Sequence, residues 1–159
     1  MYETNVWSPL HLSLDLIGAL RASSRGGAIA NVTSAAGYIS PDLHGIYGSS
    51  KSAAAALTQI MRIELAREGI TVTEVVPGPV DTQMLDVSRR APFAALALRL
   101  LPPGTPAGMA HAMLQAVERR RARVIYPWHT VPPVVFPGFG RWAMRVVASR
   151  RGTTHLSKA

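Results

Sequence analysis

The chain has 159 residues, of which 48% are hydrophobic and 16% are charged, so it is too apolar and too lightly charged to be disordered throughout. It contains no cysteine, which excludes disulfides, thiolate catalysis and zinc–thiolate sites. The formal net charge of +8 belongs to the carboxyl-terminal part, because no acidic residue follows Glu118 whereas arginine and lysine continue to Lys158. We expect one globular, cytoplasmic domain, since the sequence shows neither an export signal nor an apolar run of about 18 residues.

The first two predicted elements are a helix and a strand. Residues 3–24 have apolar side chains at helical spacing, with Pro9 in the first turns, where a proline costs least or makes a bend. The residues at this spacing are Leu10, Leu14, Ile17 and Leu20. Glycines then open a short apolar run at residues 26–34, which predicts a strand.

A long helix and a second strand follow. Residues 50–69 predict a helix that ends at Gly69. Its apolar positions are Leu57, Ile60, Met61, Ile63 and Leu65. Residues 70–78 are rich in β-branched side chains and stop at a Pro-Gly turn, which predicts a strand.

The second half of the chain predicts another helix, another strand and a basic tail. A Thr-Pro pair starts the helix at residues 105–121, and the apolar run at 122–127 predicts the third strand. Alternation of strands and helices indicates an α/β fold with a parallel, doubly wound sheet flanked by helices. We therefore expect a catalytic part at residues 1–130, with an apolar lid at about 83–105, and a basic, apolar extension at 131–159.

Candidate functional residues lie where the strands end, because ligands of doubly wound sheets bind outside the carboxyl ends of the strands. Ser34 follows the first predicted strand, and the sequence PGPVDT at 77–82 follows the second. Between them, Tyr47 and Lys51 are four residues apart in a helix and so lie on one face.

This pattern resembles the active site of the short-chain dehydrogenases/reductases. The residues that carry the resemblance are Ser34, Tyr47 and Lys51, with spacings of 13 and 4, together with Asn5 as the fourth member of a tetrad. The segment PGPVDT resembles the part of that family that lies beside the nicotinamide. The resemblance implies a partial Rossmann-like fold and an NAD- or NADP-dependent oxidoreductase that interconverts an alcohol and a carbonyl.

The resemblance also implies a role for each residue. Tyr47 is the acid/base, since the alkoxide formed by hydride addition must receive a proton. Lys51 favours the phenolate by its positive charge and holds the nicotinamide ribose. Ser34 hydrogen-bonds the substrate oxygen, and Asn5 holds the helix and a water that passes protons to Lys51. The residues expected to contact the cofactor are Tyr47, Lys51, Pro77, Gly78, Val80 and Thr82.

Several of these residues have a purely structural alternative. Asn5 is also a suitable helix cap and Ser34 a suitable strand-end turn residue, and Thr82 is a suitable N-cap for a lid helix. His44 is a candidate substrate contact or an exposed loop residue. The histidines have no spacing typical of metal ligands, so we expect no metal site.

A glycine-rich loop for the pyrophosphate is not evident in the sequence. The sequence GFGRWA at 138–143 fits the pattern G-x-G-x-x-A, but it follows a proline-rich run and has no acidic residue downstream, so we interpret the match as coincidental. In the family, that loop precedes the helix that carries the asparagine. The chain therefore resembles the carboxyl-terminal part of such an enzyme.

The expected partners follow from the apolar lid and the basic tail. We expect a small lipophilic alcohol or ketone as substrate, a homo-oligomer, and no specific nucleic-acid partner. An inactive remnant of the family or a protein-interaction module is the alternative function. Residues 140–151 predict a short helix with basic and apolar stripes, which we expect to cover the substrate pocket or to form a subunit contact. Binding of an anionic membrane or of nucleic acid by the basic tail is a less favoured alternative.

Overall fold

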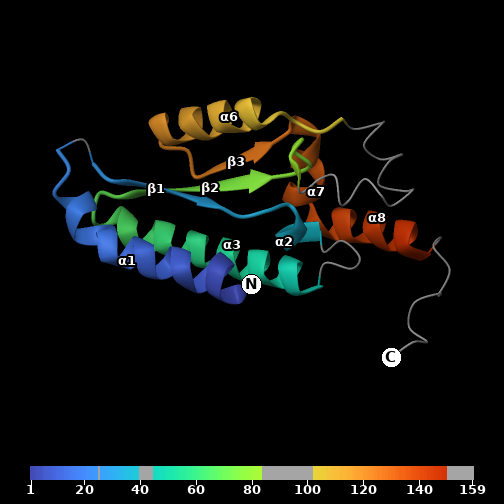
Figure 1. The fold of residues 1–159 in the computed structure, drawn as a ribbon, viewed down its shortest axis with the longest axis horizontal. Helices are drawn as coiled ribbons and strands as arrows, with labels where there is room; N and C mark the ends of the chain where they lie inside the picture. The colour runs from blue at the N-terminus through green and yellow to red at the C-terminus, as the bar shows by residue number, and fades with distance from the viewer. Residues whose placement is uncertain (25, 40–44, 84–101, 150–159) are drawn as a thin grey trace.

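The computed structural model describes residues 1–24, 26–39, 45–83 and 102–149 of the chain (Figure 1). In chain order the elements are the π-helical turn η1 (Glu3–Trp7), α1 (Ser8–Arg21), β1 (Ala28–Val32), α2 (Ala36–Ile39), α3 (Gly45–Ala66), β2 (Thr71–Pro77), α6 (Pro106–Glu118), β3 (Arg123–Tyr126), the 3-10 turn η2 (Trp128–Thr130), α7 (Val131–Val135) and α8 (Pro137–Ser149). Most of the predicted lid lies outside the described residues.

The three strands form one parallel sheet in the order β1-β2-β3, which confirms the predicted α/β class. Helices α1 and α3 cover one face of the sheet and α6 covers the other (Figure 1). The middle strand, β2, is buried from Val72 to Val76, as expected for a parallel strand covered on both faces. The β1 edge carries no further strand within the described part of the chain.

The predicted helix at 3–24 begins with one π-helical turn, Glu3–Trp7, and continues as α1. Pro9 stands in the first turn of α1, where the N–H that a proline lacks costs the helix little stability. Leu14, which shares the helical spacing, has a side chain that is 52% exposed. Leu10, Ile17 and Leu20 do pack against the core.

Helix α3 begins at Gly45, five residues before the predicted start, and so includes Tyr47 and Lys51. Of its apolar positions, Met61 and Leu65 are buried against Ile70 and Val72. The apolar spacing overestimates the buried face, since Ile60 and Ile63 are 49% and 70% exposed.

The predicted helix at 105–121 is confirmed as α6, and its start has the expected cap. The Thr105 hydroxyl accepts a hydrogen bond from the Gly108 N–H at 3.0 Å, which satisfies one of the unpaired donors of the first turn. The predicted basic helix of the tail is confirmed as α8, Pro137–Ser149. It packs on α2 and α7 at one end of the sheet (Figure 1).

Candidate active site

The predicted site residues lie at the carboxyl end of the sheet. The loop after β1 carries Ser34, and the end of β2 leads into Pro77 and Gly78. The two segments are tied together by the Ala35 N–H, which donates to the Pro77 carbonyl at 2.8 Å. This bond brings the serine loop beside the Pro-Gly segment, as expected for the ends of adjacent parallel strands.

Close contact between α2 and α3 places the Ser34 loop against the helix that carries Tyr47. A Cβ atom on Gly37 would lie 2.9 Å from the backbone of Lys51, and one on Gly48 would lie 3.2 Å from the Ala36 carbonyl oxygen. The Ser52 hydroxyl also donates a hydrogen bond to the Gly37 carbonyl. Glycine is therefore required at position 37 for the two helices to approach this closely.

Ser34 has a structural hydrogen bond of the kind that a turn residue makes. Its hydroxyl oxygen accepts from the Ala36 N–H at 3.1 Å. A hydroxyl can accept and donate at once, so this bond fixes the oxygen while its proton can be directed at a substrate. The turn and the catalytic interpretation are compatible.

Tyr47 and Lys51 lie on the same face of α3, both partly buried. The Lys51 ammonium is 6.0 Å from the centroid of the Tyr47 ring, at the limit of a cation–π contact. Its Nζ atom donates to the Val32 carbonyl oxygen at 3.0 Å, at the end of β1. Burial lowers the pKa of Lys51, because removal from water disfavours the ammonium.

Asn5 anchors the start of the first helix to α3. Its Nδ2 atom donates to the Ser50 hydroxyl at 3.0 Å, and Ser50 donates to the Tyr47 carbonyl oxygen at 2.8 Å. Ser50 is fully buried. The alternative of a helix cap is wrong for Asn5, which lies inside η1 and reaches a different helix.

Val80 and Thr82 lie in the segment that follows β2. Val80 forms an isolated parallel bridge with Gly104. The Thr82 hydroxyl is exposed and donates to the Val80 carbonyl oxygen at 3.4 Å. Both residues follow Pro77 and Gly78 along the chain, and their contact with a cofactor stays a prediction. His44 lies outside the described residues.

A buried polar network beside the site was missed by the sequence analysis. Glu74, fully buried in β2, accepts hydrogen bonds from Tyr38 at 2.6 Å, Thr33 at 3.0 Å and the Arg123 Nε at 2.7 Å. The sequence did contain a signal for this network. A carboxylate inside a β-branched strand needs a cation, and Arg123 opens the next strand. Burial and the hydrogen bond to Glu74 raise the pKa of Tyr38 to about 12.

The sequence GFGRWA lies within helix α8, so its glycines do not form a loop at a strand end. Gly140 is buried, and a Cβ atom there would lie 2.7 Å from Ile39 and 2.8 Å from the Pro133 carbonyl oxygen. It serves close helix packing, which agrees with the interpretation of the match as coincidental. No cluster of metal-binding side chains occurs among the residues that the structure describes.

None of the helices in the described ranges is long and apolar enough to cross a membrane.

Comparison with known proteins gives consistent matches. A family profile described as short chain dehydrogenase matches residues 1–92. A sorbitol dehydrogenase of Cereibacter sphaeroides is 36% identical over 86 residues, which cover 54% of this chain and 34% of the relative. The chain spans about a third of the length of the curated relatives it matches.

Solved structures match over more of the chain. A short-chain dehydrogenase of Burkholderia cenocepacia, in complex with NADP, has a TM-score of 0.68 and 29% identity, covering 96% of this chain and 59% of its own. A 7α-hydroxysteroid dehydrogenase, complexed with NADH and 7-oxo glycochenodeoxycholic acid, has a TM-score of 0.68 and 27% identity, covering 78% of this chain and 51% of its own. With the sheet topology, these matches establish that the chain belongs to the short-chain dehydrogenase family.

Proposed function

We propose that this chain carries the catalytic part of an NAD(P)-dependent oxidoreductase that interconverts an alcohol and a carbonyl. The observation that carries the proposal is the placement of Tyr47 and Lys51 on one face of α3, packed against the loop that holds Ser34. Family membership supports it, since the Burkholderia relative was solved with NADP and the hydroxysteroid dehydrogenase with NADH.

The residues present fit one end of such a cofactor. The Tyr47 hydroxyl and the Lys51 ammonium are hydrogen-bond donors suited to the hydroxyl groups of a ribose. Pro77 and Gly78 follow β2 and are tied to the Ser34 loop by the bond from the Ala35 N–H to the Pro77 carbonyl, whereas Gly78 itself packs against the side chain of Thr130. We assign these four residues to the nicotinamide riboside and Val80 and Thr82 to the rim, and we assign no residue to the pyrophosphate.

The chain's own residues provide the proton and the orientation of the substrate. Bound NADH or NADPH supplies the hydride. The Tyr47 hydroxyl donates the proton that the forming alkoxide needs, and the nearby Lys51 charge stabilises the resulting phenolate. The Ser34 hydroxyl donates a hydrogen bond to the carbonyl oxygen. Asn5 acts through Ser50 on the backbone of Tyr47, so it is a positioning residue.

Lipophilic alcohols or ketones are the proposed substrate class. The support is the apolar composition of residues 83–105 and the steroid ketone bound by one solved relative. The sorbitol dehydrogenase among the relatives shows that the family also includes an enzyme named for a polyol. A screen of steroid and long-chain ketones against sugars and polyols, with both cofactors, tests the proposal. A preference for polyols contradicts it.

The decisive experiment compares two tyrosine variants. The chain is assayed alone and fused to the amino-terminal part of the Burkholderia relative that lies outside the match. Tyr47→Phe is expected to reduce turnover by about 10²–10⁴-fold because it removes the proton donor. Tyr2→Phe is the matched control, since Tyr2 is a 40% exposed tyrosine to which the proposed mechanism gives no role. Equal turnover in both variants shows that Tyr47 is not the acid.

Two kinds of partner are part of the proposal. A homo-oligomer is supported by exposed apolar side chains on α3, including Ile46 at 68% and Ile63 at 70% exposure. Peripheral contact with anionic lipid is supported by Phe139 and Trp142, which are 58% and 57% exposed on the basic helix α8. An inactive remnant of the family remains the alternative function, and turnover by the fused chain would rule it out.

A further inference from the structure

One buried carboxylate oxygen joins the two sides of the loop that carries Ser34. Thr33 stands directly before Ser34, and Tyr38 follows it by four residues, in α2. The Thr33 hydroxyl donates to Oε1 of Glu74 at 3.0 Å, and the Tyr38 hydroxyl donates to the same oxygen at 2.6 Å. Because both bonds end on one atom of β2, they close the segment around Ser34 into a ring. We call Glu74, Thr33 and Tyr38 the carboxylate clamp.

The position of the carboxylate is fixed in turn by Arg123. Glu74 is fully buried, and its Oε2 atom accepts a hydrogen bond from the Arg123 Nε at 2.7 Å. The Arg123 Nη2 lies 2.7 Å from the same oxygen and donates to the Tyr38 hydroxyl oxygen at 2.9 Å. A guanidinium is planar and has its donors in a fixed arrangement, so these bonds orient the groups as well as attract them. Strands β2 and β3 together therefore determine where the Tyr38 hydroxyl lies.

Stability alone does not account for a charge pair at this place in the sheet. Glu74 alternates with Val72 and Val76 on one face of β2, where both valines are fully buried. Apolar residues of similar volume often replace a buried ion pair without loss of stability, because the lost hydration offsets much of the attraction. The carboxylate adds direction, since hydrogen bonds have a preferred length and angle and apolar contacts do not. The pair therefore supplies geometry to the serine loop that it touches.

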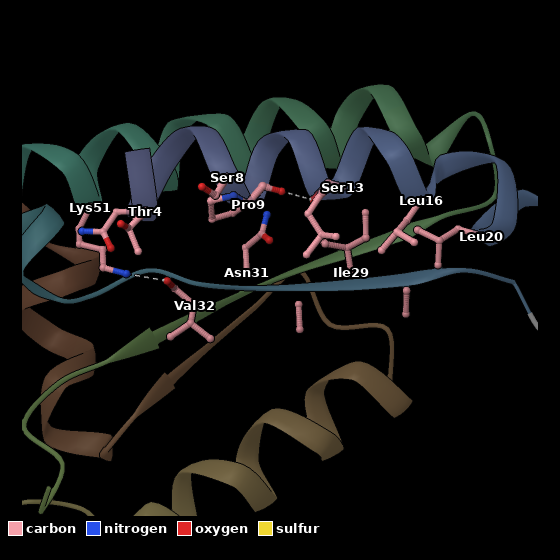
Figure 2. A pocket seen from close by; sticks show the side chains of 14 residues that line it. Thr4, Ser8, Pro9, Ser13, Leu16, Leu20, Ile29, Asn31, Val32 and Lys51 are labelled. Atoms are coloured by element: carbon pink, nitrogen blue, oxygen red, sulfur yellow. Dashed lines mark hydrogen bonds between the residues drawn. The ribbon is translucent and has the colours of Figure 1, made fainter. Parts of the chain in front are cut away.

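Helix α3 holds the backbone of the same loop. The Lys51 ammonium donates to the Val32 carbonyl oxygen at 3.0 Å, where β1 ends (Figure 2). The Ser52 hydroxyl donates to the Gly37 carbonyl oxygen, farther along the loop. These two bonds place the backbone of the loop against α3, whereas the clamp ties its side chains to the sheet. Ser34 lies in the sequence between the residues that make these bonds.

The direction of the Ser34 hydroxyl depends on the turn that the clamp closes, because its oxygen accepts a hydrogen bond from the Ala36 N–H at 3.1 Å. We propose that Glu74 is a positioning residue, which acts through Thr33 and Tyr38 to hold the Ser34 hydroxyl in place for a substrate carbonyl. The role of Ser34 toward a substrate rests on the proposed function. The hold of the clamp on the loop does not, so the two are tested separately.

Hydrogen exchange in this chain tests the clamp through the Ala36 amide, which is bonded to the Ser34 hydroxyl. Tyr38→Phe removes one donor of the clamp and keeps the ring. The Ala36 amide should exchange at least about tenfold faster in this variant, because the turn opens more often. The Ile70 amide, bonded to the Leu65 carbonyl just before β2 begins, should keep its native rate. Unchanged exchange at Ala36, or equal acceleration at both amides, would overturn the proposal.

Tyr126→Phe is the matched control for Tyr38→Phe. The Tyr126 hydroxyl accepts a hydrogen bond from the Thr105 N–H at 3.1 Å and is not part of the clamp. Both variants therefore remove a bonded hydroxyl from a partly buried tyrosine. The Ala36 amide should exchange at its native rate in Tyr126→Phe. Acceleration as large as in Tyr38→Phe would show that the loop responds to the loss of any such hydroxyl, which overturns the clamp.

Thr33 provides a second pair of variants. Thr33→Val keeps the shape of the side chain without its donor, and Thr33→Ser keeps the donor. The Thr33 hydroxyl can also donate to the Val75 carbonyl oxygen at 3.2 Å, so its share in the clamp is smaller than that of Tyr38. Exchange at Ala36 should be about three- to tenfold faster in Thr33→Val than in Thr33→Ser. Equal exchange in the two variants would overturn the part given to Thr33.

Kinetics of the fused chain test whether the clamp acts through Ser34. Tyr38→Phe should lower kcat by at least about tenfold, because a small misplacement of an orienting group slows the reaction. In a fused chain that already carries Ser34→Ala, the same change should lower kcat by less than about twofold. Equal factors in both backgrounds would overturn action through Ser34. The exchange measurements need neither cofactor nor turnover, so failure of the clamp is distinguishable from failure of the proposed function.

Discussion

Tyr38 holds its proton unusually tightly because it is half-buried and bonded to Glu74. Its folded-state pKa of about 12 lies above the ordinary tyrosine value of 10.0, so the native state binds the proton more strongly than the unfolded state does. This contribution to stability is present below pH 10 and is lost as the pH rises toward 12. Urea unfolding at pH 9, 10 and 11 should show a steeper loss for the native chain than for Tyr38→Phe. Parallel loss in both would contradict the assignment.

Removing one member of the Glu74–Arg123 ion pair should lower the stability of the chain more than removing both. Glu74→Leu leaves the guanidinium without its carboxylate and should lower the free energy of unfolding by about 3 kcal/mol. The double variant Glu74→Leu, Arg123→Met should recover most of the loss, because neither charge then remains. Chemical denaturation of the three chains measures the coupling, and additive losses would show that the pair does not act as a unit.

Helices α2 and α3 depend on glycine for their contact. Gly37→Ala should destabilise the chain by about 1–3 kcal/mol, because its Cβ atom would meet the backbone of Lys51 and Ser52 at 2.9 Å. Gly45→Ala is the matched control, since nothing lies within 4 Å of a Cβ atom at that helix start. Thermal unfolding compares the two. Similar behaviour of both variants would mean that the contact can relax at little cost.

Helix α8 presents its aromatic side chains away from the packed glycine. Gly140 faces Ile39 and Pro133, and Trp142 lies two residues on, near the opposite side of the helix. The double variant Phe139→Ala, Trp142→Ala should lose binding to vesicles that contain phosphatidylglycerol, whereas Ile63→Ala on another exposed surface should keep it. Flotation measures the bound fraction. Binding that is equal with neutral vesicles would contradict a role for the basic stripe.

The elements were predictable from the sequence because periodicity and turn residues determine them locally. Residues 70–78 showed β-branched side chains before a Pro-Gly turn, and β2 is found at Thr71–Pro77. Side-chain burial was less predictable, since it depends on which neighbours cover each helix. Leu14 and Ile63 have helical spacing, but within the described part of the chain each side chain is more than half exposed.

The candidate site was predictable only in its residue types. Spacing identified Ser34, Tyr47 and Lys51, but it could not show that the lysine ammonium bonds to the Val32 carbonyl. Nor could it show that Asn5 reaches Tyr47 through Ser50, 45 residues away in the sequence. These contacts depend on how α1 and α3 pack, which local patterns do not specify.

The whole chain is expected to bind NAD(P)H weakly on its own. The residues that we propose for the cofactor would hold only the nicotinamide riboside, so the pyrophosphate should contribute little to the affinity. Calorimetry should show no saturable binding below millimolar concentration, and size-exclusion chromatography should show association. A monomer that binds either cofactor at micromolar concentration would show that a site for the pyrophosphate exists in this chain.

The pairing of Glu74 with Arg123 also bears on the fidelity of folding. The two residues are register partners between β2 and β3. A shift of β3 by one residue would turn Arg123 to the opposite face of the sheet and leave a fully buried carboxylate without its cation. Such a misaligned sheet would be several kcal/mol less stable. A single buried charge thus selects one alignment from those that the apolar side chains of the two strands would otherwise tolerate.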